Sequence, residues 1–333
     1  MITRRSVLRI PLVLLPGSLP GHARAQEAAP ALVARYRDSS RRGRPFAKDP
    51  CVVWFRDRYW MYYSLPPYED ERRTQGWGIG IATSPDCRHW TKTGEMAAAA
   101  PYETAGFCAP GAVVIRGELH LFYQTYGLAR NDAVCHAVSS DGLTFDRNPW
   151  NPVLRAKGAW NCGRAIDAEP FVDGDRLLLY AATRDPEFRR QMVFGAEAPL
   201  GSRFRPEDLR QLADRPLLPP ELPWEKDCIE APTVIRHGGK LFMFYAGGYN
   251  NEPQQIGCAV SSDGVNWKRV SEKPLLANGA PGTWNSSESG HPGVVRLRDG
   301  RTFLFFQGNP DKGTTWELAA IELGWRSGRP VLK

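Results

Sequence analysis

A short pattern recurs at intervals of about 60 residues along the chain. Each copy contains a proline, a short apolar run, a turn rich in glycine or aspartate, and a denser run of Leu, Phe and Tyr. The five prolines are Pro50, Pro110, Pro170, Pro232 and Pro292. Apolar runs around such a turn are typical of β-hairpins, and a long fixed period indicates radially repeated units. The sequence therefore predicts an all-β fold, a five-bladed β-propeller.

Three of the units also share a turn after their third predicted strand. It begins with Ser-x-Asp and ends on an aromatic residue, at residues 84–90, 139–145 and 261–267. Serine and aspartate side chains cap tight turns, and the aromatic residue is expected to start an outer strand and pack between blades. We interpret the motif as architectural and not as catalytic.

The first 25 residues have the pattern of an export signal. Arg4 and Arg5 form a twin-arginine pair, and residues 23–25 read Ala-Arg-Ala, a small-x-small cleavage site. The apolar residues 10–15 are too few to span a bilayer. We expect export in the folded state, to a periplasm or the medium, with no membrane span. Residues 26–44 are predicted to be a mobile leader, and residues 45–333 a single propeller domain.

Charge and cysteine content argue against two kinds of site. The formal net charge is +7, and the first 25 residues carry four arginines and no acid, so the cleaved chain has 7 − 4 = +3. Without a basic run, this is not the footprint of a nucleic-acid-binding protein. The seven cysteines include no Cys-x-x-Cys, which argues against a thiolate metal site, and an odd number cannot all pair. We expect a monomer with buried free thiols.

Acidic residues precede the first strands of several units. In a propeller these strands line the central channel. The positions include Asp49, Glu230 and, in the third unit, Asp167 and Glu169, while the fifth unit has His291. Converging carboxylates raise one another's pKa and reduce stability. Glycoside hydrolysis provides a reason, since it needs two carboxyl groups in different environments. The alternative is that the acids bind a structural cation or cap strand ends.

The third unit offers two acids, and the strand spacing discriminates between them. The second strand starts nine residues after the proline in the first, second and fourth units, but seven residues after Pro170. Alignment on that strand places Ala168 at the proline position and Asp167 beside Asp49. We therefore expect Asp167 to face the channel, with Glu169 as the alternative.

These motifs together resemble the five-bladed glycosidases of glycoside hydrolase family 43 and its neighbours, over residues 45–325. The Asp-Pro at Asp49, the Ile-Asp and Phe-x-Asp around Asp167, and the Glu-Ala-Pro at Glu230 are each similar to a motif of that family. The resemblance implies an inverting reaction with Asp49 as general base, Glu230 as general acid and Asp167 as the group that tunes the acid and orients the substrate. Ala168 departs from the family, which usually has proline there.

The Gly-His at His291 is similar to a late family motif that often places a histidine beside a central cation, commonly calcium. The resemblance implies a structural calcium ion at most, and we expect no cofactor to be required. Hydrated calcium suits hard oxygen ligands. A buried histidine that bonds to backbone is the alternative.

Loops at the top of the predicted blades supply further substrate-binding candidates beside His291 and Glu169. They are Trp77, Phe107, Arg164 and Trp284. Aromatic rings offer flat apolar faces to sugar rings, although each could equally pack in a β core. We expect the substrate to be an oligosaccharide or other glycoside with an arabinose-, xylose- or galactose-type linkage, cleaved from the chain end.

Two other functions are open at this point. A propeller phosphorylase or transferase would need cationic side chains near the channel, and Arg164 and Arg184 are the candidates. A sugar-binding propeller without activity would tolerate loss of the acids, so the intact set Asp49, Asp167 and Glu230 argues against it. Residues 183–186 contain the Arg-Asp-Pro of sucrose-cleaving relatives, but they follow a second strand, which favours a simple loop turn.

Overall fold

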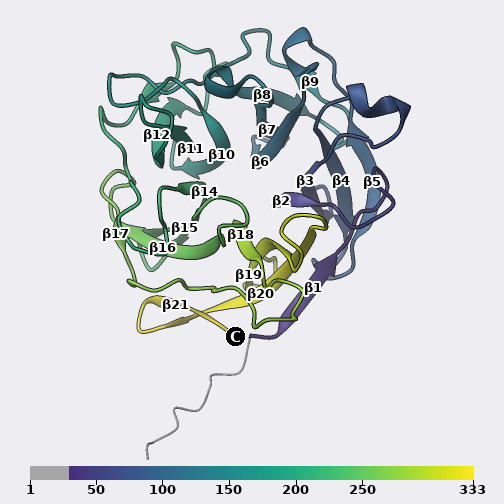
Figure 1. The fold of residues 1–333 in the computed structure, drawn as a ribbon. Coiled ribbons are helices and arrows are strands. Elements are labelled where there is room, and N and C mark those ends of the chain that lie inside the picture. The colour runs from purple at the N-terminus through teal and green to yellow at the C-terminus, as the bar shows by residue number, and fades with distance from the viewer. Residues whose placement is uncertain (1–29) are drawn as a thin grey trace, which may run out of the picture.

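The structure, a computed structural model, describes residues 30–333. Its strands form five antiparallel sheets around a central axis, so the predicted five-bladed β-propeller is confirmed (Figure 1). The predicted export signal in residues 1–25 lies outside the described residues. Helix in the described part is limited to three short 3₁₀ turns, Glu71–Thr74, Pro101–Glu103 and Ala129–Asn131. None of the helices among residues 30–333 is long and apolar enough to cross a membrane.

The strands of each blade follow one another outward from the axis in sequence order. Blade I contains β2 (Lys48–Phe55), β3 (Arg58–Leu65), β4 (Gly78–Ser84) and β5 (Thr91–Met96). Blade II contains β6 (Phe107–Ile115), β7 (Glu118–Thr125), β8 (Val134–Ser139) and β9 (Asp146–Arg147). Blade III contains β10 (Ile166–Asp173), β11 (Arg176–Arg184), β12 (Gln191–Pro199) and β13 (Arg210–Gln211). Blade IV contains β14 (Ile229–His237), β15 (Lys240–Gly247), β16 (Gln255–Ser261) and β17 (Lys268–Arg269).

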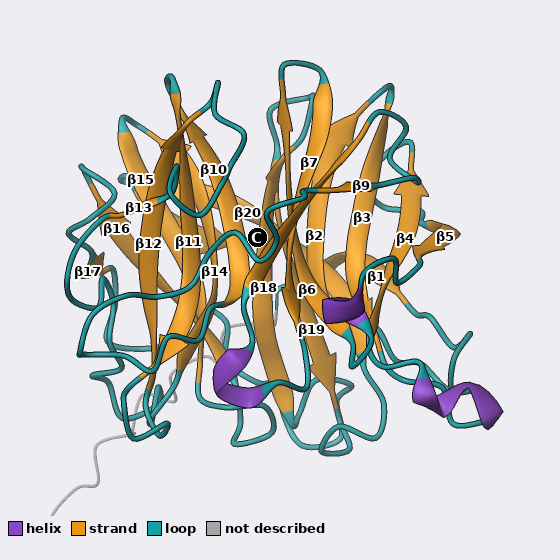
Figure 2. Cartoon of the chain, turned by 90° about the horizontal axis from the view of Figure 1, so that it is seen from above, coloured by secondary structure: helices purple, strands orange, loops and turns teal. Residues whose placement is uncertain are grey.

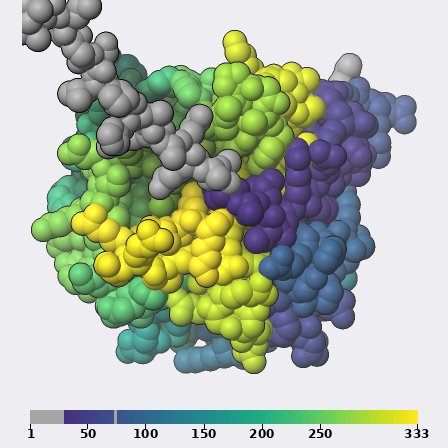
Figure 3. All heavy atoms as spheres, turned by 90° about the horizontal axis from the view of Figure 1, so that it is seen from below, coloured from purple at the N-terminus to yellow at the C-terminus, as the bar shows by residue number. Residues whose placement is uncertain are grey.

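Blade V is completed by both ends of the described chain. Its inner strands are β18 (Glu288–Arg296), β19 (Thr302–Asn309) and β20 (Glu317–Arg326), and the edge of β20 pairs with β1 (Leu32–Tyr36) and with β21 (Arg329–Leu332). Figure 3 shows the purple N-terminal segment beside the yellow C-terminal one. The prediction of a mobile leader over residues 26–44 is therefore wrong for residues 32–36. The open edge of β20 needs hydrogen-bond partners, and β1 supplies them.

The hydrophobic core is divided among the interfaces between neighbouring blades. Tyr59 and Met61 of blade I pack with Phe303 and Phe305 of blade V in one such cluster. Figure 2 shows the strands side by side along the axis. Side chains from both faces of a blade are buried, as β3 shows by contributing to two different clusters. Alternate residues of each strand therefore serve two different interfaces.

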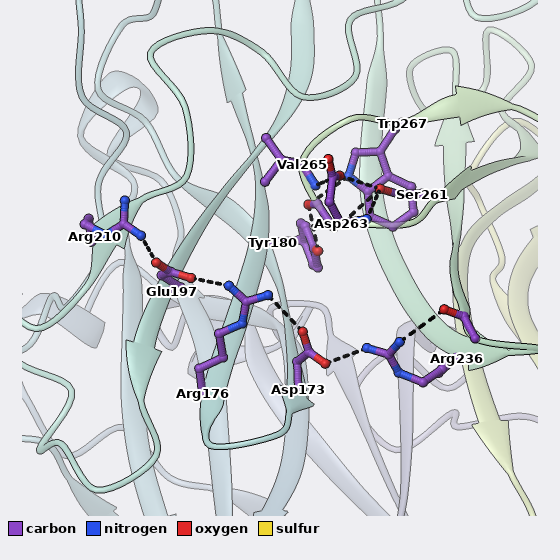
Figure 4. Close-up of polar contacts among 12 residues, drawn as sticks. Asp173, Arg176, Tyr180, Glu197, Arg210, Arg236, Ser261, Asp263, Val265 and Trp267 are labelled. Carbon is purple, nitrogen blue, oxygen red and sulfur yellow. Dashed lines mark hydrogen bonds and ion pairs between the residues drawn. The ribbon is translucent and has the colours of Figure 1, made fainter.

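The Ser-x-Asp turns have the architectural role that the sequence predicted. In blade IV, Ser261 Oγ donates to Asp263 Oδ1 at 2.9 Å, and the same Asp263 oxygen accepts the Val265 amide at 2.8 Å. The closing Trp267 packs edge-on against Tyr180 of blade III, with ring centroids 5.6 Å apart (Figure 4). The turn thus fastens blade IV to blade III.

A chain of charged side chains reinforces the same interface beyond the β10–β11 hairpin, at the end opposite the start of β10. Asp173 accepts hydrogen bonds from Arg176 at 3.0 Å and from Arg236 of blade IV at 2.5 Å (Figure 4). Arg176 also donates to Glu197 at 2.7 Å, and Glu197 pairs with Arg210. Partly exposed pairs of this kind contribute little singly, about 0.2–1 kcal/mol each.

Candidate active site

All five inner strands are interrupted by a β-bulge at the same position in the blade. In each bulge one non-glycine residue has a left-handed φ, between 43° and 55°. Such a conformation is strained for these residues, and bulges redirect side chains near functional sites. The five residues are Asp49, Ala109, Asp167, Ala231 and His291.

The bulges confirm the expected register of blade III. Asp167 has φ 53° and Asp49 has φ 55°, while Ala168 stands where the other blades have proline. Glu169 also reaches the channel, two residues after Asp167 along β10. It lines a narrow cavity of about 50 Å³ together with Asp167 and His291. Its Oε1 accepts hydrogen bonds from the Thr233 hydroxyl at 3.0 Å and from the amide of residue 234 at 2.9 Å.

Asp49 of blade I is paired with His291 of blade V. Oδ1 of Asp49 lies 3.0 Å from Nδ1 of His291. Burial alone would raise the pKa of Asp49, but the charge of His291 and then that of Lys48 lower it well below its usual range. Burial alone would lower the pKa of His291, and the Asp49 charge raises it to about 9. Asp49 is therefore ionised and His291 protonated at neutral pH.

Asp167 has the opposite electrostatic environment. Burial, assisted by the nearby charges of Glu230 and Asp49, raises its pKa to about 7, although His291 and Arg164 oppose the shift. Its backbone amide donates to Gln124 Oε1 at 2.8 Å, just as the amide of Asp49 donates to Gln307 of the adjacent blade V. The side chains of the adjacent blades thus hold both bulges.

Glu230 lies one residue before the bulge of blade IV and is held by two glutamine amides. Nε2 of Gln254 donates to Oε1 at 2.7 Å, and Nε2 of Gln191 donates to Oε2. Oε1 of Gln191 accepts in turn from Arg164 at 3.1 Å and from Arg184 at 2.9 Å. Asp49, Asp167 and Glu230 are 7%, 8% and 7% exposed, so all three are largely shielded from water.

Sequence reasoning missed three residues of this site. Gln191 and Gln254 contact Glu230, and Lys48 stands in blade I at the ladder position that Glu230 occupies in blade IV. Nζ of Lys48 donates to Asn250 at 2.9 Å and lies 4.4 Å from the centroid of the Trp316 ring. Burial opposes its charge, but Asp49 and other nearby carboxylates raise its pKa. Comparison of the residues just before the five bulges would have singled out Lys48.

The aromatic candidates have different surroundings. Trp77 is half-buried. Its ring centroid lies 5.5 Å from that of the exposed Tyr126 and 5.9 Å from Nζ of Lys48, so the side chain is near the catalytic candidates. Phe107 is 2% exposed and packs on Tyr123 in the core between blades I and II. Trp284 packs on Phe306 and beneath Arg35 at the outer part of blade V. Neither Phe107 nor Trp284 lines the cavity formed by Asp167, Glu169 and His291.

The channel does not provide a complete protein cage for a metal ion. Nδ1 of His291 is already paired with Asp49. Within residues 30–333, no three His, Cys, Asp or Glu side chains are grouped closely enough to hold a cation. A calcium ion beside His291 or Glu169 would need most of its ligands from water, as a hydrated ion has.

All seven cysteines are free thiols.

The site therefore combines three carboxyl groups in three environments. Asp49 is ionised beside a cation, the pKa of Asp167 is near neutrality, and Glu230 accepts hydrogen bonds at both oxygens. Environments that separate carboxyl groups in this way can supply a base and an acid to one reaction.

Comparison with known proteins finds relatives among enzymes that act on carbohydrates. The chain is 25% identical over 310 residues to an extracellular exo-α-(1→5)-L-arabinofuranosidase of Streptomyces avermitilis, a match covering 87% of this chain and 59% of that protein. It is 29% identical over 116 residues to a β-1,2-mannobiose phosphorylase of Thermoanaerobacter sp., covering 30% of this chain and 37% of that protein. The matched region is thus less than two thirds of either relative.

A solved structure of a thermostable family-43 glycoside hydrolase has the same fold. It superposes with a TM-score of 0.69 at 22% identity, over 86% of this chain and 92% of that one. The family described as glycosyl hydrolases family 43 matches residues 44–330, which is nearly the whole described chain. This protein belongs to glycosyl hydrolase family 43.

Proposed function

We propose that the protein is an exported, inverting glycoside hydrolase that removes arabinose-, xylose- or galactose-type units from the end of an oligosaccharide. The observation that carries this proposal is the convergence of Asp49, Asp167 and Glu230, from three blades, on one channel mouth. Family membership and the arabinofuranosidase relative support the reaction class. The twin-arginine pattern and the extracellular relative support export.

The environments of the carboxyl groups suggest their roles. Asp49 is ionised by its pairing with His291 and can accept a proton from the attacking water. Glu230 protonates the leaving oxygen, with its carboxyl group oriented by Gln191 and Gln254. Asp167, whose pKa is raised to about 7 by burial and by the nearby charges of Glu230 and Asp49, tunes the electrostatic surroundings of the acid and orients the substrate. Calcium, if bound in the channel, has no step in this scheme.

The test is an assay of the purified protein on aryl glycosides and plant oligosaccharides, beside Asp49→Asn and Glu230→Gln. General acid–base catalysis contributes about 10²–10⁴-fold, so both variants should lose activity on oligosaccharides by such a factor. Glu230→Gln should keep more activity on a dinitrophenyl glycoside, whose leaving group needs no proton. Proton NMR of the first product shows inversion or retention. Full activity of folded Glu230→Gln on oligosaccharides contradicts the proposal.

A phosphorylase is the second candidate. Two guanidinium groups converge on Gln191 beside Glu230, and a phosphorylase is among the relatives. In that case the same assay requires inorganic phosphate and releases a sugar 1-phosphate. Full turnover in phosphate-free buffer excludes this candidate.

A further inference from the structure

The rim of blade III has an excess of positive charge beside the proposed catalytic residues. The guanidinium groups of Arg130, Arg164 and Arg184 lie 4.9, 5.8 and 4.4 Å from the centroid of the Phe188 ring. Of the three, only Arg164 has a carboxylate within 4 Å among residues 30–333, namely Asp132 at 3.3 Å. Three guanidinium groups thus share one carboxylate.

The buried member of this cluster has an unmatched donor. Arg164 is 9% exposed, and its Nε has no hydrogen-bond partner within the described part of the chain. Arg184 donates through Nε to Gln191, and its one further hydrogen bond within residues 30–333 is long, 3.4 Å from Nη1 to the Phe188 carbonyl. A buried polar group without a partner destabilises the fold. A ligand that brings acceptor oxygens would satisfy the unmatched Nε donor of Arg164.

Aromatic rings pack against the guanidinium groups of the cluster. Phe188 has φ 63°, a strained conformation for a bulky residue, and this turn sets its ring among the arginines. The centroid of the Tyr249 ring lies 4.9 Å from the Arg184 guanidinium group. Asp185, on the same loop, accepts the amides of residues 189 and 190 through Oδ1 and lies beyond 4 Å of any of the three guanidinium groups. Guanidinium groups held against aromatic rings are preorganised for binding an anion.

A hydrogen-bond relay connects this cluster to Glu230. Oε1 of Gln191 accepts from both Arg164 and Arg184, and its Nε2 donates to Glu230. If Glu230 protonates the leaving oxygen, the arginines lie on the leaving-group side of the cleaved bond. The relay places two guanidinium groups within two hydrogen bonds of the proposed acid.

We propose that Arg130, Arg164 and Arg184 around Phe188 form a subsite for an anion, either a sugar carboxylate or a phosphate group. Guanidinium forks match the paired oxygens of both. The preferred substrate is then an acidic oligosaccharide in which a neutral terminal sugar is joined to an anionic residue. The position of the anion relative to the cleaved bond rests on the proposed function, whereas the anion site itself does not.

The experiment is a calorimetric titration of the full-length protein with galacturonate, glucuronate and inorganic phosphate, and with galactose and glucose as neutral references, at constant low ionic strength. We expect at least one anion to bind about tenfold or more tightly than the neutral sugars, the size expected for one charge-assisted hydrogen bond. Higher salt should weaken this preference.

Arg130→Gln is the discriminating variant. The Arg130 guanidinium contacts the Phe188 ring and the Pro186 carbonyl, at 2.8 Å, and so lies outside the relay to Glu230. It should lose much of the anion preference, and Arg184→Gln should lose more. Arg190→Gln is the matched control, because it removes a charge from the same loop where the guanidinium bonds to the Pro220 carbonyl at 2.8 Å. It should bind anions like the unaltered protein.

Equal binding of anions and neutral sugars overturns the inference, as does a preference that survives in both Arg130→Gln and Arg184→Gln. Selectivity for a uronate supports the sugar carboxylate, and selectivity for phosphate supports the phosphate group. Anion binding without hydrolysis of any glycoside overturns the proposed function and leaves the subsite standing. Hydrolysis of a glycoside without any anion preference overturns the subsite and leaves the proposed function standing.

Discussion

Nδ1 of His291 lies 3.0 Å from Oδ1 of Asp49, so the last blade meets the first through an ion pair at the mouth of the channel. Each charge stabilises the other. The pKa of His291 rises to about 9, and the pKa of Asp49 falls well below its usual range. The pairing keeps the proposed base ionised, and it also makes that base weaker.

Replacement His291→Gln should therefore shift the acid limb of the pH–activity profile. Without the imidazolium charge, the pKa of Asp49 rises, so activity is lost at a higher pH as the solution is acidified. We expect a shift of about one pH unit or more, because one pKa unit corresponds to about 1.4 kcal/mol of interaction. The measurement is kcat/KM against pH. His89→Gln, at an exposed turn, is the control.

The same variant gives a second readout in stability. The pKa of His291 is raised in the folded state. Its contribution to folding stability is therefore fully present below the unfolded-state pKa near 6.5, and it is lost as pH rises through about 9. Urea unfolding of the unaltered protein should show this loss between pH 7 and 9.5, and His291→Gln should not. Identical pH dependence in both proteins contradicts the assigned pairing.

The replacement Asp167→Asn should lower the activity and raise the stability of the folded state. The carboxyl group of Asp167 has a raised pKa, so the folded state binds more protons than the unfolded state between pH 4 and about 7, and stability falls as pH rises through that range. The neutral amide removes this effect. We expect stability at pH 8 to increase by about 1 kcal/mol or more and kcat to fall about 100-fold. A folded variant that keeps full activity argues against a catalytic role for Asp167.

A histidine pair in blade II, in which His136 is buried, should make the fold sensitive to acid. His136 stacks on His120 with ring centroids 5.2 Å apart, and burial, with a smaller effect of His120, lowers its pKa to about 3. Its stabilising effect is present above the unfolded pKa near 6.5 and is lost as pH falls toward 3. We expect a loss of about 2 kcal/mol from pH 7 to pH 5, measured by urea unfolding. His136→Gln should flatten that slope.

Blades II and IV each contain a buried glutamate that is hydrogen-bonded by an arginine and a tyrosine, here called the latch. This arrangement should contribute strongly to stability. Glu103 is 1% exposed and accepts hydrogen bonds from Arg147 at 2.8 Å and from the Tyr123 hydroxyl at 2.6 Å. Glu225 is held in the same way by Arg269 and Tyr245. Arg147→Met leaves a buried carboxylate unpaired, which typically costs about 3–5 kcal/mol.

Thermal and urea unfolding measure the effect of Arg147→Met, and Arg269→Met should behave alike. Arg298→Met, which removes a charge from the turn at residue 298 where no ion pair is found within the described residues, is the control and should change stability little. A loss below about 1 kcal/mol for both latch variants would show that water solvates these carboxylates.

Chelation should leave activity intact. Within residues 30–333 no group of side chains could hold a metal by itself, so a channel cation would be bound mainly through water. Incubation with EDTA followed by assay in chelator should reduce the rate by less than about twofold, since none of the proposed steps uses a metal. Loss of activity that calcium restores would instead place a cation in the reaction.

Much of this architecture could be read from the chain because it depends on local pattern. The hairpin turns, the five-fold period and the Ser-x-Asp turns each lie within a few residues, so propensity and turn chemistry suffice to place them. The placement of Asp167 could also be read, since a bulge position is counted from the neighbouring strand. The part played by residues 32–36 could not, because β1 is defined by its partner β20 at the other end of the chain.

The sequence by itself determined the repeat, the blade order and which blades bring an acid to the channel, because alternation and spacing act within single hairpins. Only the tertiary structure decided that His291 pairs with Asp49, that Gln191 links two arginines to Glu230, and that Phe107 is core. These contacts join different blades or loops, and their geometry depends on how the ring closes and how its interfaces pack. No local sequence pattern encodes contacts between residues of different blades, so long-range packing gives each carboxyl group its own environment.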